Sequence, residues 1–129
     1  MADSPVPDDV RRFLHRHIET VAQWEGLLVL KAHSGEALDA ATVACRLYIK
    51  DSDAEALLDR LSERGLVAVA GHDGRRRFQY RPATPGIGEV VERAAQLYGT
   101  HLIAVTHIIH ARPRRGVEAF ANAFRLRKE

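Results

Sequence analysis

The sequence is poor in cysteine. Its 129 residues include a single one, Cys45. One cysteine excludes a disulfide within the chain and any metal site built from several thiolates. It also agrees with a reducing compartment, so we expect a cytoplasmic protein. Because Cys45 falls in a short amphipathic segment, we further expect its thiol to be buried and structural rather than reactive.

Long apolar runs are also missing. The longest, HLIAVTHIIH at 101–110, holds three histidines and is far shorter than the roughly 20 residues that a membrane helix needs. The N-terminal letters MADSPVPDD are acidic and contain no apolar core. We therefore expect neither a signal peptide nor a membrane-spanning segment.

Catalytic and cofactor signatures are absent from the sequence. It contains no glycine-rich phosphate loop, no nucleophile elbow and no arrangement of paired carboxylates. His101, His107 and His110 share one apolar segment, and helical histidines could ligate zinc. However, no carboxylate stands at matching spacing, and the isoleucine and valine neighbours favour packed or interface histidines. We therefore predict no enzyme, no metal and no cofactor.

Apolar residues recur at helical spacing near the N-terminus. After a flexible lead-in at 1–7, this spacing predicts one helix over 8–19 and another over 20–32. The second helix could continue directly from the first. Gly35, in the stretch HSGEA, ends this helical region.

Two shorter helices are predicted next, joined by a turn. Asp39 is a good N-cap for the first of them, because its carboxylate can accept from the amides of the first turn. Asp51 or Ser52 is expected to cap the second, with Glu55 at the capping-box spacing from Ser52. Gly65 suits the left-handed conformation that commonly ends a helix.

After Gly65 the apolar period changes from helical to strand-like. The runs LVAVA at 66–70 and RRRFQYRP at 75–82 flank GHDG, whose Asp-Gly pair predicts a hairpin turn. A long helical pattern then covers 86–111. Pro113 stops it, and a last short helix is predicted over 116–129.

This order of elements resembles a bacterial winged helix-turn-helix domain of the kind found in transcriptional regulators, without an assignable family. The resemblance rests on LLDRLSERGLVAV running into GHDGRRRFQY, a recognition helix that leads into the wing, and it covers about 20–83. It implies a mainly α fold with a small β-hairpin, flanked by an N-terminal helix and a long C-terminal helix. We therefore expect one unit at 8–83 and a C-terminal helical dimerisation extension at 84–129.

Arginines cluster in the predicted wing. Arg75, Arg76 and Arg77 are consecutive and Arg81 follows, and each could contact a DNA phosphate. Strand alternation places Arg75 and Arg77 on one face, and Arg76 on the other face with Phe78. The alternative is a solvated charge cluster on an exposed hairpin.

The predicted recognition helix has the opposite charge. In the implied geometry it enters the major groove, with Ser52, Arg60 and Arg64 near the DNA. Yet residues 51–64 hold five acids against two bases, and over 20–83 nine acids balance nine bases. Phosphates repel such a surface. One acid could accept from cytosine, but several together are unusual.

The pattern over 86–111 is apolar enough to form an interface. Its spacings of four and three predict a coiled-coil-like seam that includes Ile87, Val91, Tyr98, Val105 and Ile108. A helix roughly 40 Å long exceeds what a small winged unit can cover. We therefore predict a homodimer through this seam, the alternative being packing against helices of the same chain. Gly99 weakens a continuous helix and could mark either a kink or a close helix crossing.

The sequence thus predicts a winged-helix transcriptional regulator that binds double-stranded DNA as a homodimer, with phosphate contacts led by the basic wing. The net charge of +2 is too small to indicate a partner by itself. The alternative is a winged helix that binds protein and not DNA, its acidic helix docking on a basic partner. A fold alone does not decide between these functions.

Overall fold

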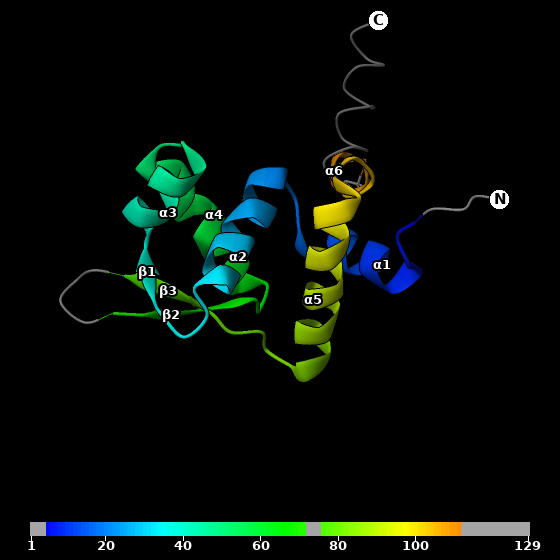
Figure 1. Ribbon diagram of the computed structural model, residues 1–129. Coiled ribbons are helices and arrows are strands. Elements are labelled where there is room, and N and C mark those ends of the chain that lie inside the picture. Colours follow the sequence, from blue (N-terminus) through cyan, green and yellow to red (C-terminus); the bar gives the residue numbers. More distant parts are fainter. Residues whose placement is uncertain (1–4, 72–75, 112–129) are drawn as a thin grey trace, which may run out of the picture.

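The computed structural model describes residues 5–71 and 76–111. In these ranges the chain forms six helices and a three-stranded antiparallel sheet (Figure 1). The helices are α1 (Asp8–His17), α2 (Val21–Ala32), α3 (Ala40–Leu47), α4 (Asp51–Glu63), α5 (Pro85–Thr100) and α6 (Leu102–His110). The strands are β1 (Leu38–Asp39), β2 (Val67–Ala70) and β3 (Arg77–Tyr80). No helix of these ranges is long and apolar enough to cross a membrane.

Three helices begin at side chains that cap the amides of the first turn. Thr20 accepts a hydrogen bond of 3.1 Å from the amide of Gln23, at the start of α2. Asp39 accepts one of 2.9 Å from the amide of Thr42, which confirms the predicted cap of α3. Thr84 caps α5 in the same way. Each cap satisfies a donor that has no partner within its helix.

The helix α4 begins without a side-chain cap. Its N-cap is Lys50, which makes no such hydrogen bond, and Asp51 is already its first helical residue. The expectation that Asp51 or Ser52 caps this helix is therefore wrong. Asp51 instead places a negative charge in the first turn, where the helix dipole favours it. Gly65 follows the end of α4 as predicted, with a φ of +77° that glycine adopts without strain.

The central strand of the sheet is β3. In the order β1-β3-β2, Phe78 pairs with Leu38 of β1 and with Val69 of β2. The ring of Phe78 is fully buried. The pairing of β2 with β3 confirms the predicted hairpin, whereas β1 is too short to give a sequence signal.

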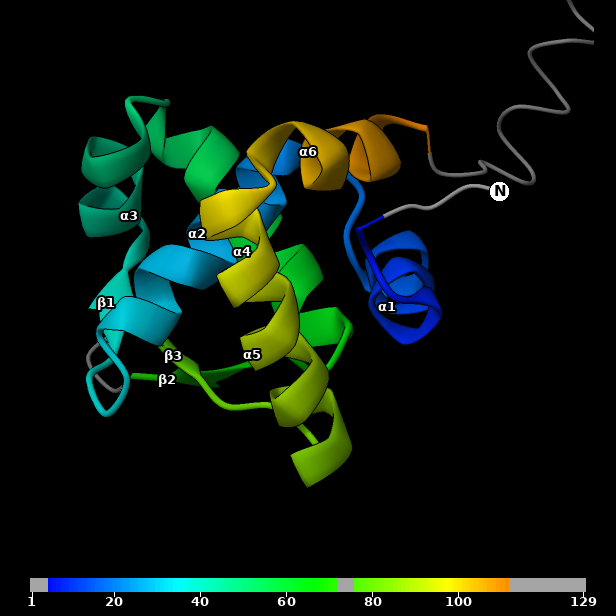
Figure 2. The same cartoon turned by 45° about the vertical axis from the view of Figure 1, so that its right-hand side comes forward.

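The core is organised around α2. Its Trp24, Leu27 and Leu30 are fully buried, and the helix contacts α3, α4 and β3 as well as α6. Figures 1 and 2 show α1, α5 and α6 side by side, at the end of the molecule away from α3. The helix-turn-helix and the sheet are thus joined through α2 to a second group of three helices.

The long helix expected over 86–111 is two helices. α5 ends just before His101, whose φ of −132° and ψ of 54° lie outside the helical region. The break lies two residues beyond Gly99, where a kink or a close helix crossing was expected. After it, α6 changes direction and buries Val105 and Ile108 against the core. The break at His101 therefore comes with the burial of apolar side chains of α6, which is favourable.

The first two helices also separate. Ile18 adopts an extended conformation, with φ −119° and ψ 123°, and its side chain is fully buried. Thr20 then starts α2 as a new helix, so a continuous helix over 8–32 is excluded.

Cys45 is exposed on α3, contrary to the expectation of a buried thiol. The buried residues of this helix are its neighbours Val43 and Ala44, so Cys45 falls on the outer side. The last helix expected over 116–129 lies outside the described residues.

Candidate nucleic-acid interface

A helix-turn-helix is formed by α3, the turn at 48–50 and α4. In the turn, Tyr48 has a φ of +60° and its side chain is 94% exposed. Its backbone amide makes the last helical hydrogen bond, to the carbonyl of Ala44, and its left-handed conformation ends α3. The first residues of α4, Asp51, Ser52 and Asp53, are all exposed. This end of α4 is therefore exposed to solvent.

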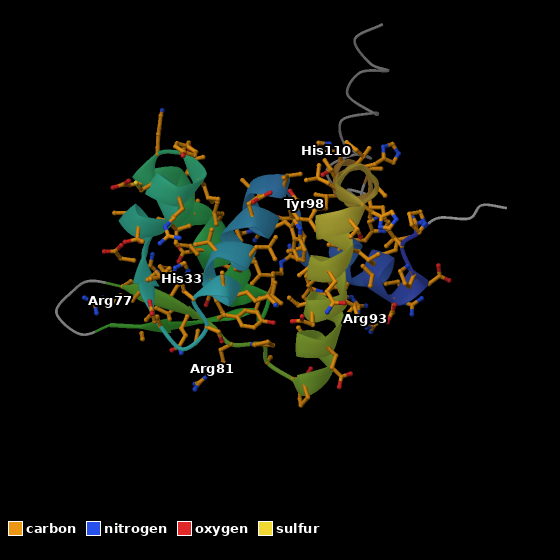
Figure 3. All side chains as sticks on the ribbon, in the orientation of Figure 1. His33, Arg77, Arg81, Arg93, Tyr98 and His110 are labelled. Atoms are coloured by element: carbon orange, nitrogen blue, oxygen red, sulfur yellow. The ribbon has the colours of Figure 1, made fainter. Side chains whose placement is uncertain are left out.

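The predicted basic wing is described in part. Arg75 lies outside the described residues. Arg77 and Arg81 are exposed, and Arg81 points away from the sheet in Figure 3. Neither forms a salt bridge with a carboxylate in the described part of the chain. The positive charges of these two arginines are therefore not paired with a carboxylate of the described residues, and they would attract a phosphate.

Arg76 is directed toward α4. Its Nη1 donates a hydrogen bond of 2.7 Å to Oδ1 of Asp59, and its Nη2 donates to Glu55. The guanidinium carbon also lies 5.3 Å from the centre of the Phe78 ring. The hydrogen bonds with Asp59 and then Glu55 raise the pKa of Arg76 further above its usual value. We call Glu55, Asp59 and Arg76 the wing bracket.

Arg60 and Arg64 are also paired within the chain. Both hold the carboxylate of Glu19, which lies between α1 and α2. Arg60 donates from Nε at 3.2 Å and Arg64 from Nη2 at 2.7 Å. The hydrogen bond with Arg60 is the largest of the effects that lower the pKa of Glu19 from 4.5 to about 2. Two arginines that the sequence placed near the groove thus tie α4 to the junction of α1 and α2.

These pairs account for much of the acidic character of α4. Glu55 and Asp59 are matched by Arg76 from the wing, and Glu63 lies 3.1 Å from Nη1 of Arg60. The acids of the first turn, Asp51 and Asp53, are exposed. The helix therefore presents less unbalanced negative charge than its sequence suggests.

The seam predicted for a dimer is mostly inside one chain. Val91 and Val105 are fully buried and Ile108 is 4% exposed, while Ile87 and Tyr98 are partly buried and pack against the same core. The expected seam required one continuous helix, and the break at His101 removes that geometry. The three buried residues have almost no surface left for a partner, which corrects their placement at an interface.

A different apolar surface lies beside the α5–α6 junction. Leu102 is 50% exposed and Ile103 is 78% exposed. They border an open hollow of about 720 Å³ that is further lined by Arg11, Thr100, His101, Ala104, His107 and Ile108. Within the described residues, no three side chains among histidine, cysteine, aspartate and glutamate come together as a metal site.

Trp24 and Tyr98 form a contact between α2 and α5. Their rings meet edge to face at 87°, with centroids 5.9 Å apart, and the Tyr98 hydroxyl donates to Glu25. Burial, together with this acceptor, raises the pKa of Tyr98 to about 12. Trp24 is fully buried, so it belongs to the core.

Known structures share this arrangement of helices and wing. The S. aureus MepR–DNA complex matches with a TM-score of 0.55 and 17% identity, over 91% of this chain and 85% of that one. The chain has a winged helix-turn-helix fold. The homodimeric winged helix-turn-helix DNA-binding domain of Mycobacterium bovis Mb0332 matches this winged helix with a TM-score of 0.52 and 17% identity, over 79% and 94% of the two chains.

A third match to the winged helix is Bordetella bronchiseptica BpsR, whose DNA binding is regulated by 6-hydroxynicotinic acid. Its TM-score is 0.52 and its identity 20%, over 93% of this chain and 84% of that one. No protein-family model matches the sequence, and no curated protein matches it either. The similarity therefore establishes the fold, as the sequence predicted, and leaves the family unassigned.

Proposed function

We propose that this winged helix is a DNA-binding transcriptional regulator whose contacts with the phosphate backbone are led by the wing. The observation that carries the proposal is the exposure of Arg77 and Arg81 beside an accessible helix-turn-helix. Both lack a salt bridge within the described residues, so binding a phosphate breaks no such pair. Arg75 is included on sequence grounds. Two of the three similar structures above are described as DNA complexes or DNA-binding domains.

In this proposal α4 approaches the major groove by its first turn. Ser52 is exposed there and its hydroxyl can donate to a phosphate oxygen. Arg60 and Arg64 take part indirectly, by holding α4 on Glu19.

We further propose that the regulator is a homodimer, formed around the hollow beside Leu102 and Ile103. Exposed apolar side chains of this size gain free energy when a second copy covers them. The proposed interface lies on the outer surface of α1 and α6, and not at the seam predicted to include Val91 and Val105. A symmetric dimer presents two wings, and therefore binds two half-sites on one duplex.

The alternative, a winged helix that docks on a basic protein through its acidic helix, has less support. Glu55 and Asp59 already hold Arg76, and a basic partner would have to displace it. The measurement below separates the two functions, because a protein-binding module has no need of affinity for duplex DNA.

The test is fluorescence anisotropy of labelled, mixed-sequence duplex DNA over a series of salt concentrations. The double variant Arg77→Ala/Arg81→Ala is compared with Arg12→Ala, which removes an exposed arginine from α1. If two phosphate contacts are lost, the slope of log K against log salt becomes shallower by about 2. The control variant keeps the wild-type slope. Absence of binding by the wild type at low salt, or equal slopes for all three proteins, overturns the proposal.

A further inference from the structure

The wing bracket joins two elements that each reach the DNA in the proposed function. Arg76 comes directly before β3, while Glu55 and Asp59 lie one turn apart on α4. The two carboxylates accept hydrogen bonds from one guanidinium, Glu55 from Nη2 and Asp59 from Nη1. A second, longer bond of 3.3 Å joins Nη2 to Oδ2 of Asp59. The planar guanidinium thus links the start of β3 to one face of α4 in a defined orientation.

The contact explains a feature of α4 that is otherwise unfavourable. Glu55 and Asp59 are four residues apart on one helix face, where like charges destabilise a helix. A cation between them reverses the sign of that interaction. Arginine suits this position because its fork can serve two carboxylates at once, which a lysine ammonium does with much less geometric definition.

Arg76 also contacts the sheet of the wing. Its guanidinium lies over the ring of Phe78, and that ring is fully buried at the centre of the sheet. The arginine therefore links an acidic pair on α4 to the core of the wing. Leaving this position for a phosphate would break the hydrogen bonds with both carboxylates and uncover the face of the ring.

We propose that Glu55 and Asp59 are positioning residues that hold the wing, through Arg76, at the angle to α4 that DNA binding requires. This inference rests on the proposed function. Arg76 stays on α4 in the complex, and the phosphates are contacted by Arg77 and Arg81. The acids of α4 thus favour DNA binding although their charge opposes it. Without the bracket, the wing has to be ordered at the moment of binding, which lowers affinity.

Two double variants with the same change of charge test the proposal. Glu55→Gln/Asp59→Asn removes two acids from α4 and opens the bracket. Asp51→Asn/Asp53→Asn removes two exposed acids from the same helix and leaves the bracket intact. Thermal unfolding first checks that both variants fold. Affinity for mixed-sequence duplex DNA is then measured under one salt condition.

Charge alone predicts that both variants bind DNA more tightly than the wild type, and to a similar extent. The bracket predicts that the variant at 55 and 59 binds about tenfold more weakly than its charge-matched control, because the preformed wing is lost. Equal affinities of the two variants overturn the proposal.

The role of Arg76 is tested by adding Arg76→Gln to the wild type and to the variant at 55 and 59. A positioning role predicts a loss of affinity in the wild type and little further loss in the variant, since the bracket is already open. Little loss in the wild type and a larger loss in the variant would mean that the acids hold Arg76 away from the DNA and that it contacts phosphate once released. That result contradicts the proposal. Arg76→Lys retains the charge and is expected to restore only part of the affinity.

Hydrogen exchange in the absence of DNA supplies a readout that is independent of the proposed function. The amides of β2 and β3 are expected to exchange faster in the variant at 55 and 59 than in its control. If the wild type binds no DNA, the proposed function fails, and the exchange rates still decide whether the acids order the wing. If DNA binds and exchange is unchanged, the bracket fails alone.

Discussion

Glu19 and Arg60 are 41 positions apart in the sequence and joined by hydrogen bonds in the fold, one of them 3.2 Å long from Nε of Arg60. The same carboxylate accepts from Arg64 at 2.7 Å and from the side-chain amide of Gln23 at 3.1 Å. Glu19 therefore connects the start of α2 with the end of α4. Through it, the helix proposed to approach DNA is fixed to the junction of α1 and α2.

Replacing Glu19 with glutamine is expected to lower the free energy of unfolding by about 2 kcal/mol, the usual cost of removing hydrogen bonds to a charged group. Chemical denaturation at neutral pH measures the change. Glu36→Gln, at an exposed position between α2 and β1, is the control for the loss of one acidic charge. A Glu19 variant as stable as this control would show that the three partners of Glu19 contribute nothing.

The same residue predicts a dependence of stability on pH. The pKa of Glu19 is lowered from 4.5 to about 2, so its contribution is present above pH 4.5 and is lost as the pH falls toward 2. The Glu19→Gln variant is expected to show a smaller fall of stability over this window than the wild type. Parallel curves for the two proteins would contradict the assignment.

Two glycines are expected to respond in opposite directions to alanine. Gly65 has a φ of +77°, and a Cβ there would lie 3.3 Å from the Cβ of Ala83, so Gly65→Ala is expected to destabilise the protein by about 1–2 kcal/mol. At Gly99, in α5, a Cβ would meet nothing within 4 Å. Gly99→Ala is expected to stabilise the protein by about 0.5–1 kcal/mol. Thermal or chemical unfolding measures both, and equal signs would refute the conformational argument.

The proposed dimer surface predicts the effect of a charge at Ile103. Because its side chain is 78% exposed, Ile103→Glu is expected to leave the fold intact and to convert a dimer into a monomer. Light scattering after size-exclusion chromatography gives the mass. Val69→Glu is the matched control, since Val69 is an exposed apolar residue on β2, away from the hollow. A wild type that is monomeric at all concentrations, or a variant that stays dimeric, rules out this surface.

Elements with a strong apolar period were predictable from the sequence. The stripe of α4 and the hairpin after Gly65 follow directly from spacing and turn residues. The boundary between α1 and α2 also lies within two residues of the predicted one. The break at His101 was not predictable, because the apolar pattern over 86–111 is continuous in the sequence and the break accompanies the packing of α6 into the core.

The candidate site was predictable only in outline. The exposed arginines of the wing follow from strand alternation, but the partners of Arg60 and Arg64 do not, since Glu19 is remote in sequence. One signal for the bracket does exist. Glu55 and Asp59 are like charges at helical spacing, and such a pair destabilises a helix when no cation lies between the two carboxylates. The arginine cluster at 75–77 follows this pair by about 20 positions and could supply that cation.

The most direct test of the DNA-binding account is hydrogen exchange of the wild-type protein with and without a saturating amount of duplex DNA. Slower exchange is expected at the first turn of α4 and along β2 and β3, with α6 unchanged by DNA. Protection confined to α1 and α6, or no change anywhere at a DNA concentration that should saturate the protein, would contradict the account.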